Sequence, residues 1–397
     1  QKDRMERIVR ADVAAYGQGK SAMANAIIEQ SGVRIGEDRR RGRGAGLNPS
    51  GRFEPTSRHV FDDGWESIEE LPPFKTEVQV EKPRTIITRN DSPDISFDRS
   101  INPYRGCEHG CIYCFARPSH AYLNLSPGLD FETRIVAKVN AAERLREALA
   151  SRAYEPAALV IGTATDAYQP IERQLGLTRA CIEVLVAARH PFSIVTKSAG
   201  IERDLDLLAP HAARGLCSVY VSVTSLDSRL SRILEPRAAA PERRLQTIRR
   251  LSEVGVPVGV SVSPVIPFLN EPELERILEA AQAVGATSAF SIVLRLPWEV
   301  NPLFQEWLQA HFPDRVGRVM NRIRDMRGGK DYDSNFGSRM MGEGMWADMI
   351  AQRFRKALAV LNARKNSRFQ QLDTSKFRKP LVLRAKKRNG TQMDFFG

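Results

Sequence analysis

The 397-residue sequence has few cysteines, no long hydrophobic run and fewer acidic than basic residues. Its five cysteines are an odd number, and three of them lie in one short stretch, which is not the pattern of a disulfide framework. No run reaches the roughly 18 to 20 apolar residues of a membrane span, and the first residues lack the apolar core of a signal peptide. These absences predict a cytoplasmic protein with free thiols and no membrane partner.

The shortage of acidic residues leaves a large positive charge. The chain carries 59 Lys and Arg against 47 Asp and Glu, for a net charge of +12. This excess favours a polyanionic partner, and we expect DNA. Part of the charge lies in two runs near the chain ends, for which we expect mobile basic arms; the alternative is solvated tails that only aid solubility. The runs contain Arg34, Arg39, Arg40, Arg41 and Arg43, and Lys376, Arg378, Lys379, Arg384, Lys386, Lys387 and Arg388.

The middle of the chain alternates short β-branched runs with amphipathic helical patterns, which is typical of βαβ units. Six runs are candidate strands, at residues 96–103, 157–163, 192–196, 216–223, 257–263 and 289–296. Six such units predict an α/β fold, a partial (β/α)6 TIM-like barrel that is open on one side, with its active site at the carboxyl ends of the strands. We expect a basic Arg/Gly-rich N-terminal extension, the barrel, a helical C-terminal extension and a basic tail, at residues 1–75, 76–300, 301–370 and 371–397.

The three clustered cysteines have the spacing C-x3-C-x2-C, in Cys107-Glu-His-Gly-Cys111-Ile-Tyr-Cys114. A [4Fe-4S] cluster normally takes four cysteines, so three close ligands without a fourth leave one iron open to a substrate or cofactor. The alternative is a structural zinc site, in which His109 or His120 completes a tetrahedral Cys3His set.

At this loop the chain resembles the radical S-adenosylmethionine (SAM) superfamily. The segments 102–107, 114–117, 165–170 and 196–198 resemble its spore photoproduct lyase-related branch, and the match covers about residues 95–300. The resemblance implies that Cys107, Cys111 and Cys114 bind a [4Fe-4S] cluster whose open iron is chelated by SAM. It also implies a reductant such as flavodoxin or ferredoxin, and a 5'-deoxyadenosyl radical that abstracts hydrogen from a DNA lesion.

Polar residues follow the predicted strands at the ends where a barrel active site lies. The resemblance implies that Lys197 and Ser222 hold the SAM carboxylate and that Tyr113 lies beside the cofactor. Further candidates for cofactor contacts at the strand ends are Thr165, Asp166, Thr224 and Ser263.

The hydrogen donor of this branch has no match in the sequence. Spore photoproduct lyases carry a donor cysteine after the second strand, where this chain has Gly162-Thr163-Ala164-Thr165. Cys181 and Cys217 are expected to be core thiols, because unpaired cysteine is among the most buried residue types. Tyr104 or Tyr168 is a candidate donor in place of the cysteine.

The final residues suggest a second partner. Gln392, Met393, Asp394, Phe395 and Phe396 resemble the short peptides with which bacterial proteins bind the DNA sliding clamp, and a tethered peptide of this kind raises the local concentration of an enzyme on DNA. The alternative is a terminus whose phenylalanines pack on their own domain.

Three functions therefore remain open on the sequence. The first is a radical SAM lyase that repairs DNA. The second is a radical SAM enzyme that modifies a protein side chain, RNA or a small metabolite. The third is a DNA-associated binding module whose cysteine loop binds structural zinc.

Overall fold

The computed structural model describes residues 35, 40, 42–54, 74–364 and 372–380. The peptide at residues 392–396 and the basic residues Arg34, Arg39, Arg41, Arg384 and 386–388 lie outside the described residues. Everything below refers to the described part of the chain.

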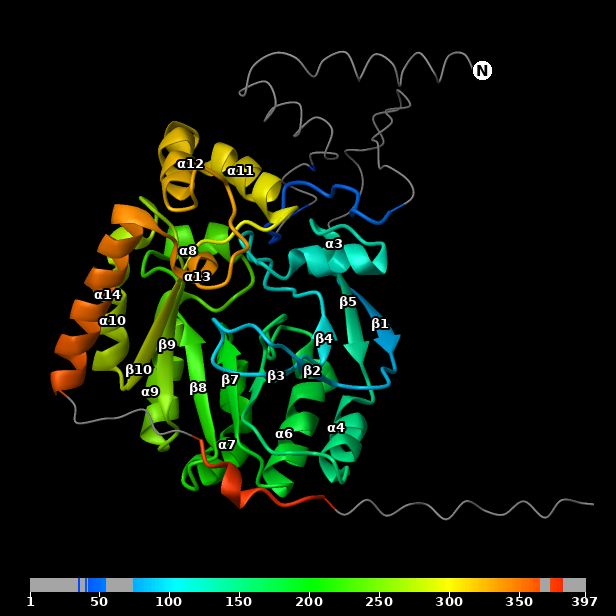
Figure 1. The fold of residues 1–397 in the computed structure, drawn as a ribbon. Helices are drawn as coiled ribbons and strands as arrows, with labels where there is room; N and C mark the ends of the chain where they lie inside the picture. The colour runs from blue at the N-terminus through cyan, green and yellow to red at the C-terminus, as the bar shows by residue number, and fades with distance from the viewer. Residues whose placement is uncertain (1–34, 36–39, 41, 55–73, 365–371, 381–397) are drawn as a thin grey trace, which may run out of the picture.

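A seven-stranded sheet forms the centre of the fold (Figure 1), in the order β10-β9-β8-β7-β6-β3-β2. Every neighbouring pair from β10 to β3 is parallel, and β2 (Ile87–Arg89) pairs antiparallel with β3 at one edge. The six predicted strands are thereby confirmed. They are β3 (Arg99–Ile101), β6 (Leu159–Ile161), β7 (Phe192–Thr196), β8 (Cys217–Ser222), β9 (Val258–Val265) and β10 (Ser288–Val293).

Helices cover the outer face of this sheet, as expected for a partial barrel. Their apolar stripes pack on the buried strand residues, so that Ile194, Val219 and Val260 share one core with Leu185 and Ile248. Helix α9 starts at a proline, where the missing backbone amide costs nothing. The covering helices are α4 (Ala141–Ala150), α6 (Leu177–Ala187), α7 (Leu205–Ala212), α9 (Pro241–Glu253) and α10 (Leu274–Ala283).

The other face of the strands is only partly buried. Ser193, Val195 and Tyr220 alternate with buried residues along β7 and β8 and are half-buried, as is Phe290 on the edge strand β10. A Cβ atom on Gly259 of β9 would overlap the Tyr220 ring and the Ser288 hydroxyl, so glycine makes room there for the tyrosine ring. This inner face is therefore accessible from the open side of the barrel.

A second, smaller sheet was not predicted. Its order is β1-β5-β4, with β1 (Glu77–Glu81), β5 (Arg134–Lys138) and β4 (Tyr104–Arg105). β1 has mostly exposed side chains and β4 contains two residues, so neither has the apolar alternation that reveals a strand in a sequence. This sheet lies beside the large one and carries the start of the cysteine loop.

Short helices form most connections at the carboxyl ends of the strands, and a helical region follows β10 as predicted. The connecting helices are η1 (Arg117–Leu123), α3 (Asp130–Thr133), α5 (Glu172–Leu175), η2 (Ala199–Asp204), α8 (Ser228–Leu234) and η3 (Glu271–Glu273). The later helices are α11 (Val300–His311), η4 (Pro313–Arg315), α12 (Val316–Asp325), α13 (Ser338–Met341), α14 (Gly344–Arg364) and η5 (Thr374–Lys376). None of the described helices is both long and apolar enough to span a membrane.

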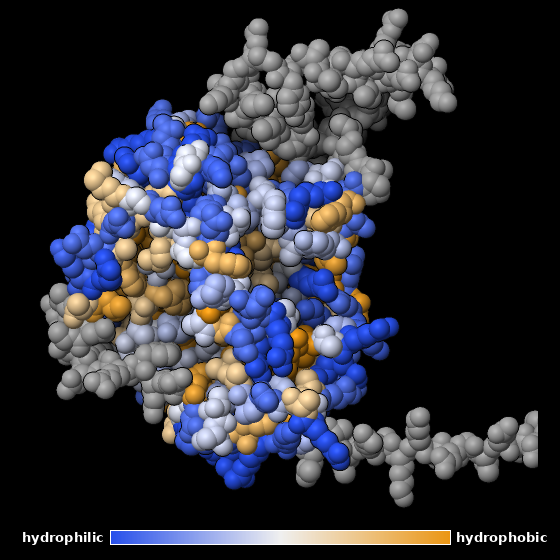
Figure 2. Space-filling view, in the orientation of Figure 1, coloured by the Kyte–Doolittle hydropathy of each residue, from blue (hydrophilic) through white to orange (hydrophobic). Residues whose placement is uncertain are grey.

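Figure 2 shows the same face as Figure 1. Hydrophilic residues cover its upper part over α11 and α12, and hydrophobic residues reach the surface in its middle, near α13 and β10. The edge strand β10 has half-buried side chains along most of its length, consistent with an open barrel edge.

The prediction of two mobile basic arms is wrong for the described part of each run. The Arg43 guanidinium donates to the carbonyl oxygens of Glu132 and Phe74, and the following residues Ala45 and Leu47 are buried in the core. At the other end, the Lys376 ammonium donates to the Arg214 carbonyl and the Lys379 ammonium to the Arg152 carbonyl. Both runs use part of their charge to bind the barrel.

Candidate functional site

The cysteine loop runs from β4 to η1, at the carboxyl ends of the barrel strands. Cys107 and Cys111 are buried, Cys114 is half-buried, and all three thiols are free. The Cys107 amide donates to the Phe131 carbonyl at 2.9 Å, which anchors the start of the loop. Gly110 has a φ of +66° and its Cβ position is 2.6 Å from a Glu132 oxygen, so this turn requires glycine.

Arg117 fixes the loop from the protein interior. This arginine is fully buried, and its guanidinium donates to the carbonyl oxygens of Cys111 and Gly110 and, at 2.6 Å, to the Glu132 carboxylate. The same carboxylate accepts the amides of Gly44 and Ala45 at 2.8 and 2.9 Å. Glu132 therefore joins the Arg/Gly segment to the cysteine loop, a contact between residues far apart in sequence.

The loop after β6 holds the cysteine loop from another side. The Gln169 side-chain nitrogen donates to the Gly106 carbonyl, and the Gln169 side-chain oxygen accepts a hydrogen bond from the Glu108 backbone amide. Asp166 lies 3.3 Å from His109 Nδ1 and accepts the Lys197 amide at 2.7 Å. Burial raises the pKa of Asp166, but His109 and these hydrogen bonds outweigh burial and hold the pKa below its ordinary value. The Asp166 carboxylate is thus engaged with protein groups, which gives it a positioning role.

The three thiols fit a [4Fe-4S] cluster better than a zinc ion. Among the described residues, no three His, Cys, Asp or Glu side chains are close enough to hold a single metal ion. His109 Nδ1 lies 3.3 Å from Asp166 and His120 Nε2 donates to the Arg134 carbonyl, and neither histidine belongs with the cysteines to a group that could hold one metal ion. A cube binds each cysteine through a different iron, so its ligands stand farther apart than those of one zinc.

Burial controls the protonation of the thiols. It raises the pKa of Cys107 well above its ordinary value and that of Cys111 to about 12, although nearby Lys197 opposes the shift at Cys111. Iron binding requires the thiolates and burial opposes their formation, so we expect the loop to release protons when it is loaded.

A buried network of charges lies beside the loop, around Glu235. The Tyr113 hydroxyl and the Arg244 guanidinium both donate to the Glu235 carboxylate, and the Thr224 hydroxyl donates to it at 2.5 Å. Burial favours the neutral acid, but Arg244 and Lys197 hold the pKa of Glu235 below its ordinary value. Sequence reasoning missed Glu235 and Arg244, because nothing local distinguishes them from other helix-flanking charges.

Lys197 is the cation that remains available at this point. Its ammonium lies 5.8 Å from the centre of the Tyr113 ring, and among the described residues it has no hydrogen bond or ion pair. Burial lowers the pKa of Lys197, but Cys111 and Glu235 more than compensate and raise it, so the side chain is charged. A charged, unpaired lysine beside the cysteine loop suits a carboxylate ligand.

Three other predicted cofactor contacts, Ser222, Thr165 and Ser263, lie at the same strand ends and differ in their hydrogen bonds. Ser222 is buried at the end of β8, where its carbonyl accepts a hydrogen bond from Arg244. The hydroxyls of Thr165 and Ser263 are buried, and neither has a hydrogen-bond partner among the described residues. Buried hydroxyls without partners are costly, so these two are available to a ligand.

The hydroxyls of the two predicted hydrogen donors are bound to buried carboxylates. The Tyr104 hydroxyl donates to Glu172 at 2.5 Å and the Tyr168 hydroxyl to Asp204 at 3.0 Å. Burial, followed by these carboxylates, raises the pKa of both phenols. In contrast, Tyr220 lies on the inner face of the barrel. The sequence could have indicated this position, because Tyr220 stands between the buried residues Val219 and Val221 of β8.

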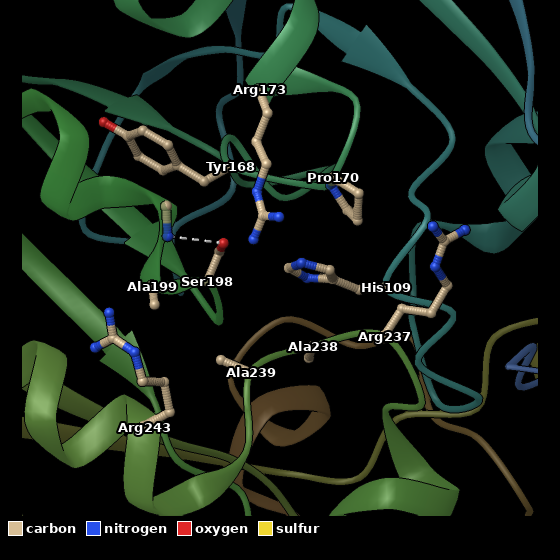
Figure 3. A pocket seen from close by; sticks show the side chains of 11 residues that line it. His109, Tyr168, Pro170, Arg173, Ser198, Ala199, Arg237, Ala238, Ala239 and Arg243 are labelled. Carbon is tan, nitrogen blue, oxygen red and sulfur yellow. Dashed lines mark hydrogen bonds between the residues drawn. The ribbon is translucent and has the colours of Figure 1, made fainter.

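A cavity of about 390 Å³ lies beside the cysteine loop. Figure 3 shows His109 on one side, Ser198 from the end of β7 on the other, and the Arg173 guanidinium pointing between them. Arg237 and Arg243 complete the basic part of the lining. The cavity shares His109 with the cysteine loop, but no cysteine of that loop lines it, and neither do the two residues expected to hold the SAM carboxylate.

The family follows from this geometry together with the sequence relatives. The radical SAM superfamily model matches residues 101–281, which include the cysteine loop and strands β6 to β9. An uncharacterised protein of Mycobacterium tuberculosis is 37% identical over 58% of this chain and 68% of its own length. An uncharacterised protein of Methanocaldococcus jannaschii is 24% identical over 56% of this chain and 79% of its own length. The chain belongs to the radical SAM superfamily.

The fold is also found in spore photoproduct lyase. A complex of that enzyme with dinucleoside spore photoproduct has a TM-score of 0.52 at 18% identity, over 72% of this chain and 79% of the enzyme. A mutant of the same enzyme, with phenylalanine in place of one tyrosine, has a TM-score of 0.53 with the same identity and coverage. At this identity the likeness concerns the fold.

Membership of the superfamily defines the cofactors as a [4Fe-4S] cluster and SAM. Cys107, Cys111 and Cys114 are the residues that would hold the cluster, and Lys197 is a cation close to Tyr113 of the same loop. A reductant is required, because the superfamily cleaves SAM with one electron.

Proposed function

We propose that this chain is a lyase-like radical SAM enzyme that acts on a lesion in DNA. The cluster and SAM supply a 5'-deoxyadenosyl radical, and a flavodoxin or ferredoxin supplies the electron. The fold shared with spore photoproduct lyase, which is solved with dinucleoside spore photoproduct, and the net charge of +12 both support a nucleic-acid substrate. In this proposal Cys107, Cys111 and Cys114 bind the cluster, and Lys197, Ser222, Thr165 and Ser263 contact SAM.

The observation that carries the proposal is a stack of exposed aromatic rings around an arginine. The Tyr122 and Phe53 rings lie 4.9 Å apart, and the Arg52 guanidinium lies 5.4 Å from Phe53 and 4.3 Å from the Trp298 ring. Tyr122, Phe53 and Trp298 are 66%, 50% and 61% exposed. Arg52 thus contacts two exposed rings, and the third exposed ring, Tyr122, packs on Phe53; exposed hydrophobic groups gathered in this way mark an interaction site.

The stack is built from segments that flank the cysteine loop. Tyr122 belongs to η1, which follows Cys114 closely, and Trp298 lies between β10 and α11. Trp298 has a φ of 44°, a strained backbone conformation for a bulky residue, and Arg52 is tied to its neighbour Glu299 at 2.6 Å. Strain that presents a large ring to solvent is expected where the ring is used.

Such a stack suits nucleobases that have left the double helix. Aromatic rings bind unstacked bases of any sequence with about 1–3 kcal/mol per base, and arginine adds a cation for the phosphates. A lesion must be extruded from duplex DNA to reach a radical inside a barrel. We therefore place the neighbours of the extruded lesion on Phe53, Tyr122 and Trp298.

The inner face of the barrel receives the lesion in this proposal. Tyr220 and Phe290 offer it two rings, which lie 5.0 Å apart, and the Ser288 hydroxyl lies 3.4 Å from the Tyr220 hydroxyl. Tyr220 replaces Tyr104 and Tyr168 as the candidate hydrogen donor, because its ring lies on this inner face.

The test is anaerobic reconstitution with iron and sulfide, followed by measurement of 5'-deoxyadenosine formed from SAM and dithionite. We expect ultraviolet-irradiated DNA to raise the rate and intact DNA to leave it unchanged. If neither DNA changes the rate, a DNA lesion is excluded as the substrate, and a protein side chain, RNA or a small metabolite becomes the favoured substrate. No cluster and no cleavage would contradict the whole proposal.

The stack is tested separately with Trp298→Ala. We expect weaker binding of single-stranded DNA, by about 1–3 kcal/mol, and unchanged SAM cleavage without DNA. Met345→Ala is the matched control, because Met345 is 86% exposed on α14, a helix that contributes no residue to the stack. Equal DNA binding by the two variants would show that the rings do not contact bases.

A further inference from the structure

The cavity beside the cysteine loop is strongly basic. Its lining contains Arg173, Arg237 and Arg243, together with His109, and no aspartate or glutamate. A volume of about 390 Å³ lies within the range of pockets that hold small ligands, roughly 300–1,000 Å³. Charge of one sign, concentrated in a concave site, predicts an anionic ligand.

Arg173 is the free cation of the cavity. Among the described residues its guanidinium has no hydrogen bond and no ion pair, and it points into the cavity between Ser198 and His109 (Figure 3). Arginine presents a planar fork of donors that binds phosphate or carboxylate through two parallel hydrogen bonds. Arg173 is an exposed residue, so its unpaired fork is open to a ligand that enters the cavity.

The other two arginines are held in place at the edge of the cavity. Arg237 lies 3.2 Å from the Glu108 carboxylate, and Arg243 binds Glu202 through two nitrogens at 2.5 and 2.9 Å. Arg250 binds Glu202 as well, so one carboxylate there faces two guanidinium groups. Among the three arginines of the lining, Arg173 is therefore the one whose charge is not paired with a carboxylate.

Ser198 supplies a neutral donor opposite the arginines. Its hydroxyl oxygen accepts the Gly200 amide at 3.1 Å, which orients the oxygen and leaves the hydroxyl proton to donate. Phosphate accepts several hydrogen bonds at once and carries more than one negative charge near neutral pH. We propose that this cavity binds a phosphate group, either from a free phosphorylated ligand or from a nucleic-acid backbone.

The occupied cavity would brace the segments that carry the reaction site. The Arg237 amide donates to the His109 carbonyl and the Ala239 amide to the Lys197 carbonyl, both at 3.3 Å. A ligand that joins Arg173 to Ser198 and the loop at 237–239 would therefore hold the cysteine loop against β7. The inference does not depend on the DNA lesion, since a phosphate can bind here whatever the substrate of the enzyme is.

The test is calorimetric titration of the cluster-loaded full chain with inorganic phosphate, thymidine monophosphate and a short single-stranded oligonucleotide. We expect Arg173→Ala to weaken binding by about tenfold or more, because a bidentate charged contact is lost. Arg173→Lys should be intermediate, since it keeps the charge and loses the fork. Arg146→Ala is the matched control, because Arg146 is exposed on α4, outside the cavity.

The two sources of phosphate are separated by the three ligands. A loss confined to inorganic phosphate and the nucleotide would assign the cavity to a free ligand, and a loss confined to the oligonucleotide would assign it to a nucleic-acid backbone. Equal binding by Arg173→Ala and Arg146→Ala would overturn the proposal. So would displacement of phosphate by SAM, which would make the cavity part of the cofactor site, or an effect of Arg173→Ala on flavodoxin binding alone, which would indicate an acidic protein.

Discussion

The two cysteines outside the cysteine loop differ from Cys107, Cys111 and Cys114 in their surroundings, although four of the five cysteines are buried and the fifth, Cys114, is half-buried. Cys181 lies on the apolar face of α6, and the Cys217 thiol donates to the Leu208 carbonyl at the amino end of β8. Both are core residues, as predicted. These two thiols therefore lie in the core, apart from the three cysteines that we propose as cluster ligands.

Replacement of Cys111 by alanine should remove the cluster. We expect iron content to fall from about four atoms per chain to a small fraction of that, with loss of the cluster's visible absorbance. Cys181→Ala is the control, and it should keep its iron while losing about 1 kcal/mol of stability to the smaller side chain. Full iron content in the Cys111 variant would exclude it as a ligand.

Tyr220→Phe should separate SAM cleavage from turnover of the lesion. The substitution keeps the ring that packs on Phe290 and removes the hydroxyl that we propose as hydrogen donor. We expect 5'-deoxyadenosine to form at the normal rate while repair of irradiated DNA falls by at least about tenfold, because the donor is absent. Tyr168→Phe serves as the comparison, and repair at the wild-type rate by the Tyr220 variant would remove that residue from the mechanism.

Two buried histidines should make the protein less stable in mild acid. Burial lowers the pKa of His120 and of His190 to about 4, below the ordinary value of 6.5. Their neutral forms therefore stabilise the fold fully above about pH 6.5, and this contribution is lost as the pH falls toward 4. Each of these pKa shifts corresponds to about 3 kcal/mol in the free energy of unfolding, gained above pH 6.5 relative to pH values below 4.

The measurement is chemical unfolding at a series of pH values. In His190→Gln we expect lower stability at pH 8, because the bond between the Tyr154 hydroxyl and His190 Nε2 is altered, and a shallower decline between about pH 6.5 and 4. An unchanged slope would mean that His190 does not titrate in this window.

At the scale of elements, the Arg/Gly segment and the cysteine loop form one unit. A Cβ atom on Gly44 would overlap the Gly110 carbonyl oxygen, and the Glu132 carboxylate accepts the amides of Gly44 and Ala45. The segment therefore cannot pack as it does with any larger residue at this position.

Gly44→Ala should weaken the binding of the cluster, although Gly44 is not one of the proposed cluster ligands. We expect a loss of stability on the order of 1–3 kcal/mol and faster release of iron to a chelator, because the loop loses its outer support. Gly317→Ala in α12 is the control, since nothing lies within 4 Å of its Cβ position and alanine favours helix by up to about 1 kcal/mol. Equal iron release by both variants would separate the segment from the loop.

The elements also show what the sequence could and could not predict. Apolar periodicity located β7, β8 and β9 and the helices α6, α9 and α10, because each buries a regular face against its neighbours. The same reasoning failed for β1 and β4, which are held by pairing with β5 and carry no apolar repeat. Local spacing likewise predicted the cysteine loop, whereas its supports Glu132, Gln169 and Glu235 act on residues distant in sequence.

The whole molecule combines a net charge of +12 with a cysteine loop at one end of the barrel. Binding of DNA should therefore weaken steeply with salt, with a logarithmic slope of about −0.7 per phosphate contacted for single strands. Fluorescence anisotropy between about 50 and 200 mM salt measures this slope. Trp298→Ala should lower the affinity at every salt concentration without changing the slope, because stacking releases no ions; a flat profile for the unmodified chain would rule out phosphate contacts.

The segment at residues 373–380 packs against the barrel at the end opposite the cysteine loop. The Asp373 amide donates to the Gly215 carbonyl and the Arg378 amide to the Ala188 carbonyl, while the Phe377 ring packs 5.3 Å from that of His190. These contacts lie beside the starts of β7 and β8, opposite the cysteine loop (Figure 1). The segment therefore covers the end of the barrel opposite the cysteine loop, so a partner that binds this segment would leave the carboxyl ends of the strands uncovered.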